Sequence, residues 1–130
     1  MRNARINFRQ SERSHLMENM VYNELRIRGF NVDVGVVPVV LTDDNGRQQR
    51  ASLEVDFVCN LGSRRYYIQS AYRMESDEKI RQERASLLKV NDSFKKIIVI
   101  GEESPVIRDE AGITTISIFD FLLKDNSLEL

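Results

Sequence analysis

The sequence is short of the residues on which several common kinds of protein depend. Its 130 residues include one cysteine, one histidine, two prolines and no tryptophan. A single cysteine excludes an internal disulfide and a multi-cysteine zinc site, and one histidine cannot supply the ligands of a zinc centre. Cys59 falls on the apolar face of an expected strand, which indicates a small core residue rather than a nucleophile.

Long apolar runs and phosphate-binding glycine motifs are also missing. No run approaches eighteen apolar residues, so we expect no membrane span, and the first ten residues contain no apolar segment of a secretory signal. These features favour a cytoplasmic setting. The six glycines are widely separated and form no G-x-x-x-x-G-K-[ST] loop. ATP is therefore not expected to bind these residues in the P-loop manner.

Charge is nearly balanced over the chain but unevenly distributed. The formal net charge is −1, yet residues 1–73 contain eleven arginines and eight acids, whereas residues 74–130 carry eight bases and twelve acids. A basic first half is typical of surfaces that contact a phosphate backbone. A solvated surface that also contacts another part of a longer protein is the alternative interpretation.

Hydrophobic periodicity and turn residues predict one α/β (α+β) domain over residues 1–130. We expect the order α-β-β-β-α-β-β-α, with a mixed central sheet flanked by helices, because a strand meander is followed by a crossover helix and further strands. The expected helices are 11–30, 75–90 and the end of 113–123. The expected strands are 31–41, 51–60, 64–72, 95–101 and the start of 113–123. Residues 103–112 read as a loop, and residues 124–130 as a polar tail.

The segment LEVDFVCNLGSRRYYIQSAY, residues 53–72, carries the most informative polar pattern. If Gly62 and Ser63 form a two-residue turn, Asp56 lies opposite Gln69 and Glu54 lies near them on the same face. Strict alternation would put Glu54, Asp56 and Val58 on one face of the strand, and its other apolar residues on the opposite face. The hairpin therefore predicts a polar cluster of Glu54, Asp56 and Gln69.

Two interpretations of this cluster are open. Mg²⁺ prefers hard oxygen ligands, and two strand carboxylates with Glu18 from the first helix could hold it. A metal held in this way can generate hydroxide for hydrolysis of a phosphodiester. The alternative is a solvent-facing strand surface on which the acids are hydrated.

These residues resemble the PD-(D/E)xK, or restriction-endonuclease-like, nuclease superfamily. Asp56 matches the first acid of that pattern, Gln69-Ser70-Ala71 occupies the (D/E)-x-K position, and Glu18 in MENMVYNEL matches a helix acid of resolvase-like members. The resemblance implies a restriction-endonuclease-like fold. It also implies a site of Glu18, Glu54, Asp56, Gln69 and Arg73, with Mg²⁺ as the possible cofactor on the three carboxylates.

A closer resemblance covers almost the whole chain. ERSHLMENMVYNELRIRGFNVDVGVV, LEVDFVCN, RYYIQSAY and ISIFDFLL together resemble the C-terminal domain, of unknown function, of bacterial and archaeal AAA-type ATP-binding proteins. The resemblance implies a C-terminal fragment of a longer ATPase. Its implied partner is an upstream ATPase domain, which would hold any ATP.

The chain departs from the nuclease pattern at two positions. Gln69 is neutral where the pattern has an acid, and Ala71 replaces the lysine that would orient the attacking water. Arg73, Lys79 or Arg81 could supply positive charge nearby, but arginine titrates too high to transfer protons. We therefore expect a degenerate site on an accessory interaction module. A Mg²⁺-dependent nuclease acting on DNA and a non-cleaving DNA-binding domain are the alternatives.

Overall fold

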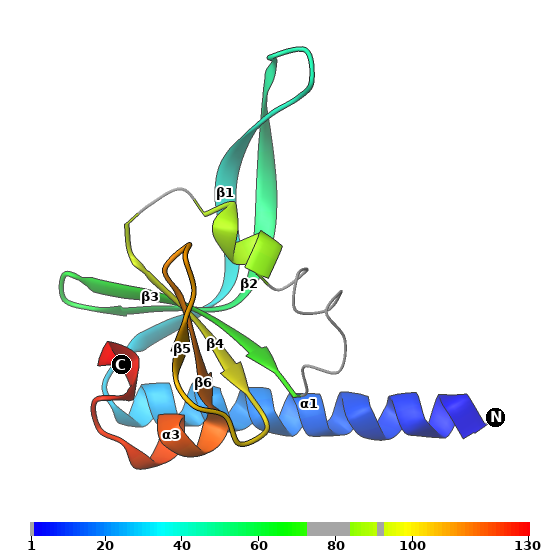
Figure 1. Ribbon diagram of the computed structural model, residues 1–130, viewed down its shortest axis with the longest axis vertical. Coiled ribbons are helices and arrows are strands. Elements are labelled where there is room, and N and C mark those ends of the chain that lie inside the picture. Colours follow the sequence, from blue (N-terminus) through cyan, green and yellow to red (C-terminus); the bar gives the residue numbers. More distant parts are fainter. Residues whose placement is uncertain (1, 73–83, 91–92) are drawn as a thin grey trace.

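The computed structural model describes residues 2–72, 84–90 and 93–130. A six-stranded mixed sheet forms the centre of the domain, with strand order β1-β2-β3-β4-β6-β5. The long helix α1 and the short helix α3 lie on one side of the sheet (Figure 1). This arrangement confirms the predicted fold class. Within the described residues, no helix is both long and apolar enough to cross a membrane.

Helix α1, Arg2–Ile27, begins well before the predicted start at Ser11 or Ser14. The prediction of its start was wrong because no proline or glycine interrupts the first ten residues, so the helix continues through both serines. Its other end agrees with the sequence. Gly29 adopts a positive φ of 92°, which glycine tolerates and which ends the helix before β1.

The first three strands form the predicted antiparallel meander. These are β1 (Asn31–Thr42), β2 (Gln48–Leu61) and β3 (Arg64–Ala71). Gly62 takes a positive φ of 61° in the β2–β3 turn, and Phe57 lies opposite Ile68 as the predicted register requires. Strands β1 and β2 are longer than expected, and their outer parts project from the body as a hairpin (Figure 1).

The second half of the chain completes the sheet with parallel strands. Residues 84–88 are helical, and the rest of the predicted helix 75–90 includes residues outside the described part of the chain. β4 (Lys95–Ile100) lies between β3 and β6 (Ile113–Ser117) and is parallel to both. The expected loop contains a short strand, β5 (Ile107–Arg108), that pairs with β6.

Side chains pack on both faces of the sheet. On one face, α1 contributes Met17, Val21 and Leu25 to a core with strand residues and with Phe121 of α3 (Ile118–Leu123). On the other face, Leu87 of the helical segment packs against a second cluster that includes Tyr67 and Ala71 of β3. Burial on both faces agrees with the apolar run of β4.

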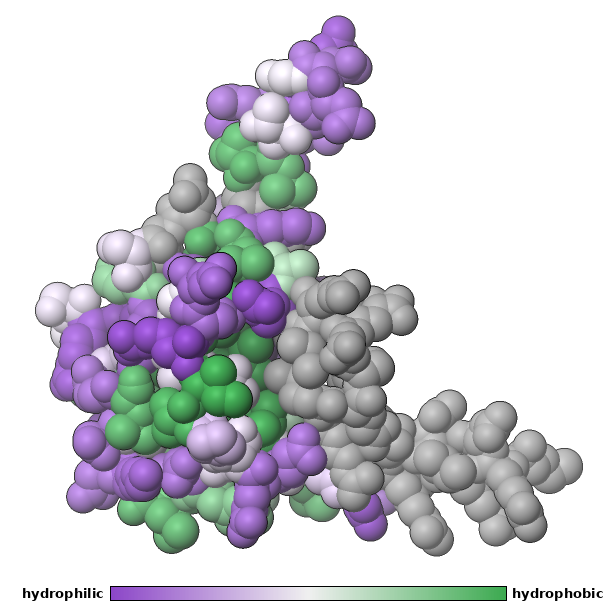
Figure 2. All heavy atoms as spheres, in the orientation of Figure 1, coloured by the Kyte–Doolittle hydropathy of each residue, from purple (hydrophilic) through white to green (hydrophobic). Residues whose placement is uncertain are grey.

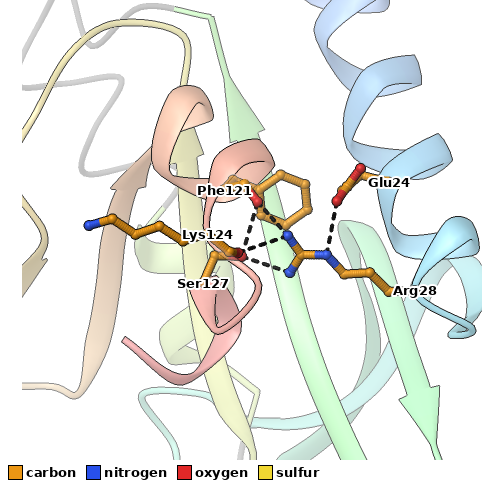
Figure 3. Close-up of polar contacts among 5 residues, drawn as sticks. All are labelled: Glu24, Arg28, Phe121, Lys124 and Ser127. Carbon is orange, nitrogen blue, oxygen red and sulfur yellow. Dashed lines mark hydrogen bonds and ion pairs between the residues drawn. The ribbon is translucent and has the colours of Figure 1, made fainter.

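The chain end is folded rather than a free polar tail, and Arg28, the residue after α1, is among the side chains that bond it. Residues Ser127–Glu129 form a 3₁₀ turn, η1, and Leu128 is buried. Arg28 donates to Ser127 Oγ at 2.7 Å and to the carbonyl oxygens of Phe121 and Lys124 at 2.6 and 3.1 Å. Its Nε also pairs with Glu24 Oε1 at 3.0 Å (Figure 3). The helix acid pre-orients the guanidinium, which then bonds the last segment.

Candidate functional site

An irregularity between β1 and β2 decides which side chains meet at the site. Cα pairing runs from Asp33 opposite Val58 directly to Gly35 opposite Val55, so β2 holds one extra residue in this interval. Such a bulge reverses the alternation of faces along the strand. Phe57 packs in the core beneath α1, whereas Val55 packs in the cluster on the other face of the sheet.

The bulge makes the simple alternation predicted for this strand wrong. Val55 and Phe57 do not share a face, because the extra residue in β2 separates them. Gly35 is required at the bulge. A Cβ on it would lie 2.6 Å from the carbonyl oxygen of Val55, which is closer than side-chain carbons are found. The missing side chain therefore lets β1 approach β2 where the two polar residues Glu54 and Asp56 emerge.

Three of the predicted carboxylates line one pocket. Glu18 lies on α1, and Glu54 and Asp56 lie on β2. The cavity measures about 430 Å³, and its remaining lining comes from Asn19, Tyr22, Val34, Gly35, Val55 and Phe57. The structure thus brings the helix acid and the two strand acids together, in agreement with the position expected for Glu18.

Asp56 is the most constrained of these acids. Its Oδ2 accepts hydrogen bonds from the backbone nitrogen of Ser70 at 2.8 Å and from the Ser70 hydroxyl at 3.1 Å. Burial raises the pKa of Asp56 above the ordinary value of a carboxyl, the two bonds from Ser70 oppose that rise, and the charge of Glu54 adds to it. Ser70 is therefore the residue that keeps this half-buried carboxylate in place.

The acids also influence each other through space. The pKa of Glu18 is raised, first by burial and then by the negative charge of Asp56, while His15 acts in the opposite direction. His15 Nδ1 lies 3.7 Å from Glu18 Oε2 on the same helix. The pocket is consequently a site of concentrated negative charge in which protonation relieves repulsion.

Gln69 does not join the carboxylates in the pocket. Its Oε1 accepts the backbone N–H of Asp56 at 2.9 Å, and its Nε2 donates to the carbonyl oxygen of Glu54 over a long 3.4 Å. Strand pairing between β2 and β3 ends at Phe57 and Ile68. The buried amide of Gln69 therefore takes the place of a peptide group where the two strands separate.

The other residues considered for the predicted site lie away from the pocket or outside the described part of the chain. Ala71 is buried in the cluster on the far face of the sheet, and it is not among the residues that line the carboxylate pocket. Arg73, Lys79 and Arg81 lie outside the described residues. No role for Ser70 was predicted from the sequence, although a serine between Ile68 and Tyr72 on an apolar strand face was a usable signal.

The pocket contains the right ligand type for Mg²⁺ but not a formed coordination shell. Carboxylate oxygens are the ligands that Mg²⁺ prefers, and it demands near-octahedral geometry. Among the described residues, no group of three or more His, Cys, Asp or Glu side chains has the spacing of a metal centre. Asp56 Oδ2 is already engaged by Ser70, and Gln69 by the β2 backbone. These residues do not fit the metal as they stand.

Comparison with known proteins gives a family and one relative. Residues 13–121 match the family model described as "Domain of unknown function (DUF4143)". The chain is 30% identical over 108 residues to an "Uncharacterized protein" of Haemophilus influenzae. This match covers 83% of the chain and 23% of the relative, so the chain spans about a quarter of the length of the curated relative that it matches.

Proposed function

The chain belongs to the family of domains of unknown function DUF4143, and from that premise we propose that it is an accessory interaction module of a longer ATPase. Its restriction-endonuclease-like scaffold would carry a degenerate, non-catalytic site. The short coverage of the Haemophilus influenzae relative supports a longer protein, because most of that polypeptide lies outside the matched segment. The partner would be an upstream ATPase domain that holds the nucleotide, in a cytoplasmic protein.

The proposal rests on the hydrogen bonds that the Gln69 side chain makes with the backbone of β2. A nuclease of this pattern needs a second acid at this position to share a cation with Asp56. Here both polar atoms of the Gln69 amide are bonded to the backbone of β2, at Asp56 and Glu54. Ala71, at the position of the patterned lysine, is 3% exposed and packs in an apolar cluster. Both side chains serve the packing of the sheet.

A cleavage assay tests the proposal directly. The chain would be incubated with branched and single-stranded DNA in the presence of Mg²⁺ or Mn²⁺, beside the variants Asp56→Ala and Asp120→Ala. Asp120 is an acid of α3 outside the pocket, so its variant is the matched control. We expect no cleavage above background in any sample. Cleavage by the parent and Asp120→Ala that disappears in Asp56→Ala would overturn the proposal.

A Mg²⁺-dependent nuclease is the second candidate, because Glu18, Glu54 and Asp56 do line one pocket. The three carboxylates would have to rearrange around a cation, because among the described residues they form no metal centre as they stand, and Arg73 would hold phosphate. The same cleavage assay decides between the two candidates. Binding of DNA without cleavage, with an affinity that falls steeply as salt increases, would instead favour a DNA-binding domain using the arginine-rich first half.

A further inference from the structure

In the described part of the chain, no strand lies beside β2 in the outer part of the β1–β2 hairpin. β2 pairs with β1 from Gln48 to Asn60, but it pairs with β3 only between Phe57 and Leu61. The part of this hairpin beyond the bulge, residues 35–42 of β1 with residues 48–55 of β2, therefore projects from the body as two strands (Figure 1). We call this part the ribbon. An isolated two-stranded ribbon is marginally stable in water, and a third strand is the usual remedy.

The direction of the backbone groups along β2 follows from one hydrogen bond. The carbonyl of Glu54 points toward β3, because Gln69 Nε2 donates to it from that side. Alternate residues of an antiparallel strand direct their N–H and C=O groups to the same edge. Gln48, Arg50 and Ser52 therefore direct theirs to the edge of β2, and in the described part of the chain no strand lies beside them.

The opposite edge of the ribbon is interrupted for an added strand. Pro38 lies opposite Ser52 in the register of β1 with β2. The same alternation turns the nitrogen of Pro38 to the outer edge of β1, where it has no hydrogen to donate. A proline at this place is a known means of preventing strand addition. Among the described residues, the row of open pairing groups that no proline interrupts is thus that of β2.

Apolar side chains also remain uncovered on this ribbon. Val40, opposite Arg50, is 61% exposed, and Val34 at the bulge is 80% exposed. Figure 2 shows a hydrophobic band across the hairpin below its hydrophilic tip. A surface with open backbone groups and exposed valines is suited to association with another strand pair.

We propose that the open edge of β2 pairs with β2 of a second copy of this chain. Antiparallel pairing about a two-fold axis beside Ala51 places Arg50 opposite Ser52 of the second copy, and Ser52 opposite its Arg50. Arg50 then lies diagonal to Glu54 of the second copy, within reach of its carboxylate, and also diagonal to Arg50 of the second copy beside the axis. Because the axis repeats the Arg50–Glu54 contact, two opposite-charge pairs form against one pair of arginines. The two hairpins become one four-stranded arm.

Sedimentation equilibrium of the chain over a range of concentrations tests this pairing. We expect a monomer–dimer equilibrium and slowed hydrogen exchange of the Arg50 and Ser52 amides in the dimer. Ser52→Pro removes an amide on the open edge and should raise the dimer dissociation constant about tenfold or more. Val40→Pro is the matched control, because it removes an amide on the opposite edge of the same ribbon.

Exchange of the charges at Arg50 and Glu54 tests the pairing a second time, through the dimer dissociation constant. Arg50→Glu should weaken the dimer about tenfold because it places two acids on the diagonal, and the double variant Arg50→Glu with Glu54→Arg should restore it. Thermal melting of every variant monitors folding. A chain that stays monomeric, equal losses in Ser52→Pro and Val40→Pro, or no recovery in the double variant would overturn the proposal. None of these readouts depends on the proposed accessory function.

Discussion

The carboxylate of Asp56 accepts two hydrogen bonds from Ser70, one from the backbone at 2.8 Å and one from the hydroxyl at 3.1 Å. This contact joins β2 to β3 at the point where their regular pairing has ended. It stabilises the ionised form of an acid whose burial favours the protonated form. The balance between these two effects makes the pocket sensitive to pH.

Stability should fall as pH rises through the titration of Asp56 and Glu18. Both acids have a pKa that is raised in the folded state, so the folded chain holds these protons more tightly than the unfolded chain. Ionisation of these two acids lowers the free energy of unfolding. This loss is absent below the ordinary carboxyl pKa and complete above the pKa in the folded state. Asp56→Asn should therefore gain stability relative to the parent as pH increases across this range, measured by urea unfolding. A constant difference at every pH would contradict the prediction.

Removal of the Ser70 hydroxyl should raise the pKa of Asp56 further. Ser70→Ala keeps the backbone bond but loses the hydroxyl bond to the ionised carboxylate. Titration of the Asp56 carboxyl by NMR measures the change. Ser63→Ala, in the exposed β2–β3 turn, is the control and should leave the Asp56 pKa unchanged.

Loss of the Gln69 amide should destabilise the fold by about 1–3 kcal/mol, because Gln69→Ala leaves polar groups of the β2 backbone without partners. Gln69→Glu should also destabilise, since a carboxylate cannot donate to the Glu54 carbonyl and adds charge beside Asp56. Relative to the parent at the same pH, only the glutamate variant should recover part of the lost stability at low pH. Urea unfolding at two pH values checks both results, with the exposed Gln49→Ala as control.

Arg28 should be difficult to replace. Arg28→Ala removes three bonds to the C-terminal segment, and we expect a loss of about 2–3 kcal/mol. Arg28→Lys should lose most of the same stability because one ammonium group cannot reproduce the guanidinium fork. Thermal unfolding measures both variants, and the exposed Arg47→Ala should show little change. Wild-type stability in Arg28→Lys would show that charge alone suffices.

Cys59 should react with thiol reagents only when the chain unfolds. The side chain is fully buried, and burial raises its pKa to about 12, so the reactive thiolate is scarce in the folded state. Labelling rates followed across a urea series should track global unfolding. Fast labelling in buffer would show local opening of the β2–β3 pair instead.

Several structural features were predictable because they depend on neighbouring residues. The β2–β3 register follows from a two-residue turn with glycine first, and Gly29 ends α1 because it can adopt a positive φ. The start of α1 was predicted wrongly, and the turn at Ser127–Glu129 was not predicted. The turn depends on bonds from Arg28, which is distant in sequence.

The sequence by itself determined the types of the three acids, the antiparallel meander and the parallel strand that follows it. Only the tertiary structure decided which of those acids share a pocket and what Gln69 does. The reason is the bulge at Gly35: one extra residue in β2 reverses the faces of Val55 and Phe57. Such a shift arises from the pairing of two strands, and alternation within one strand does not contain it.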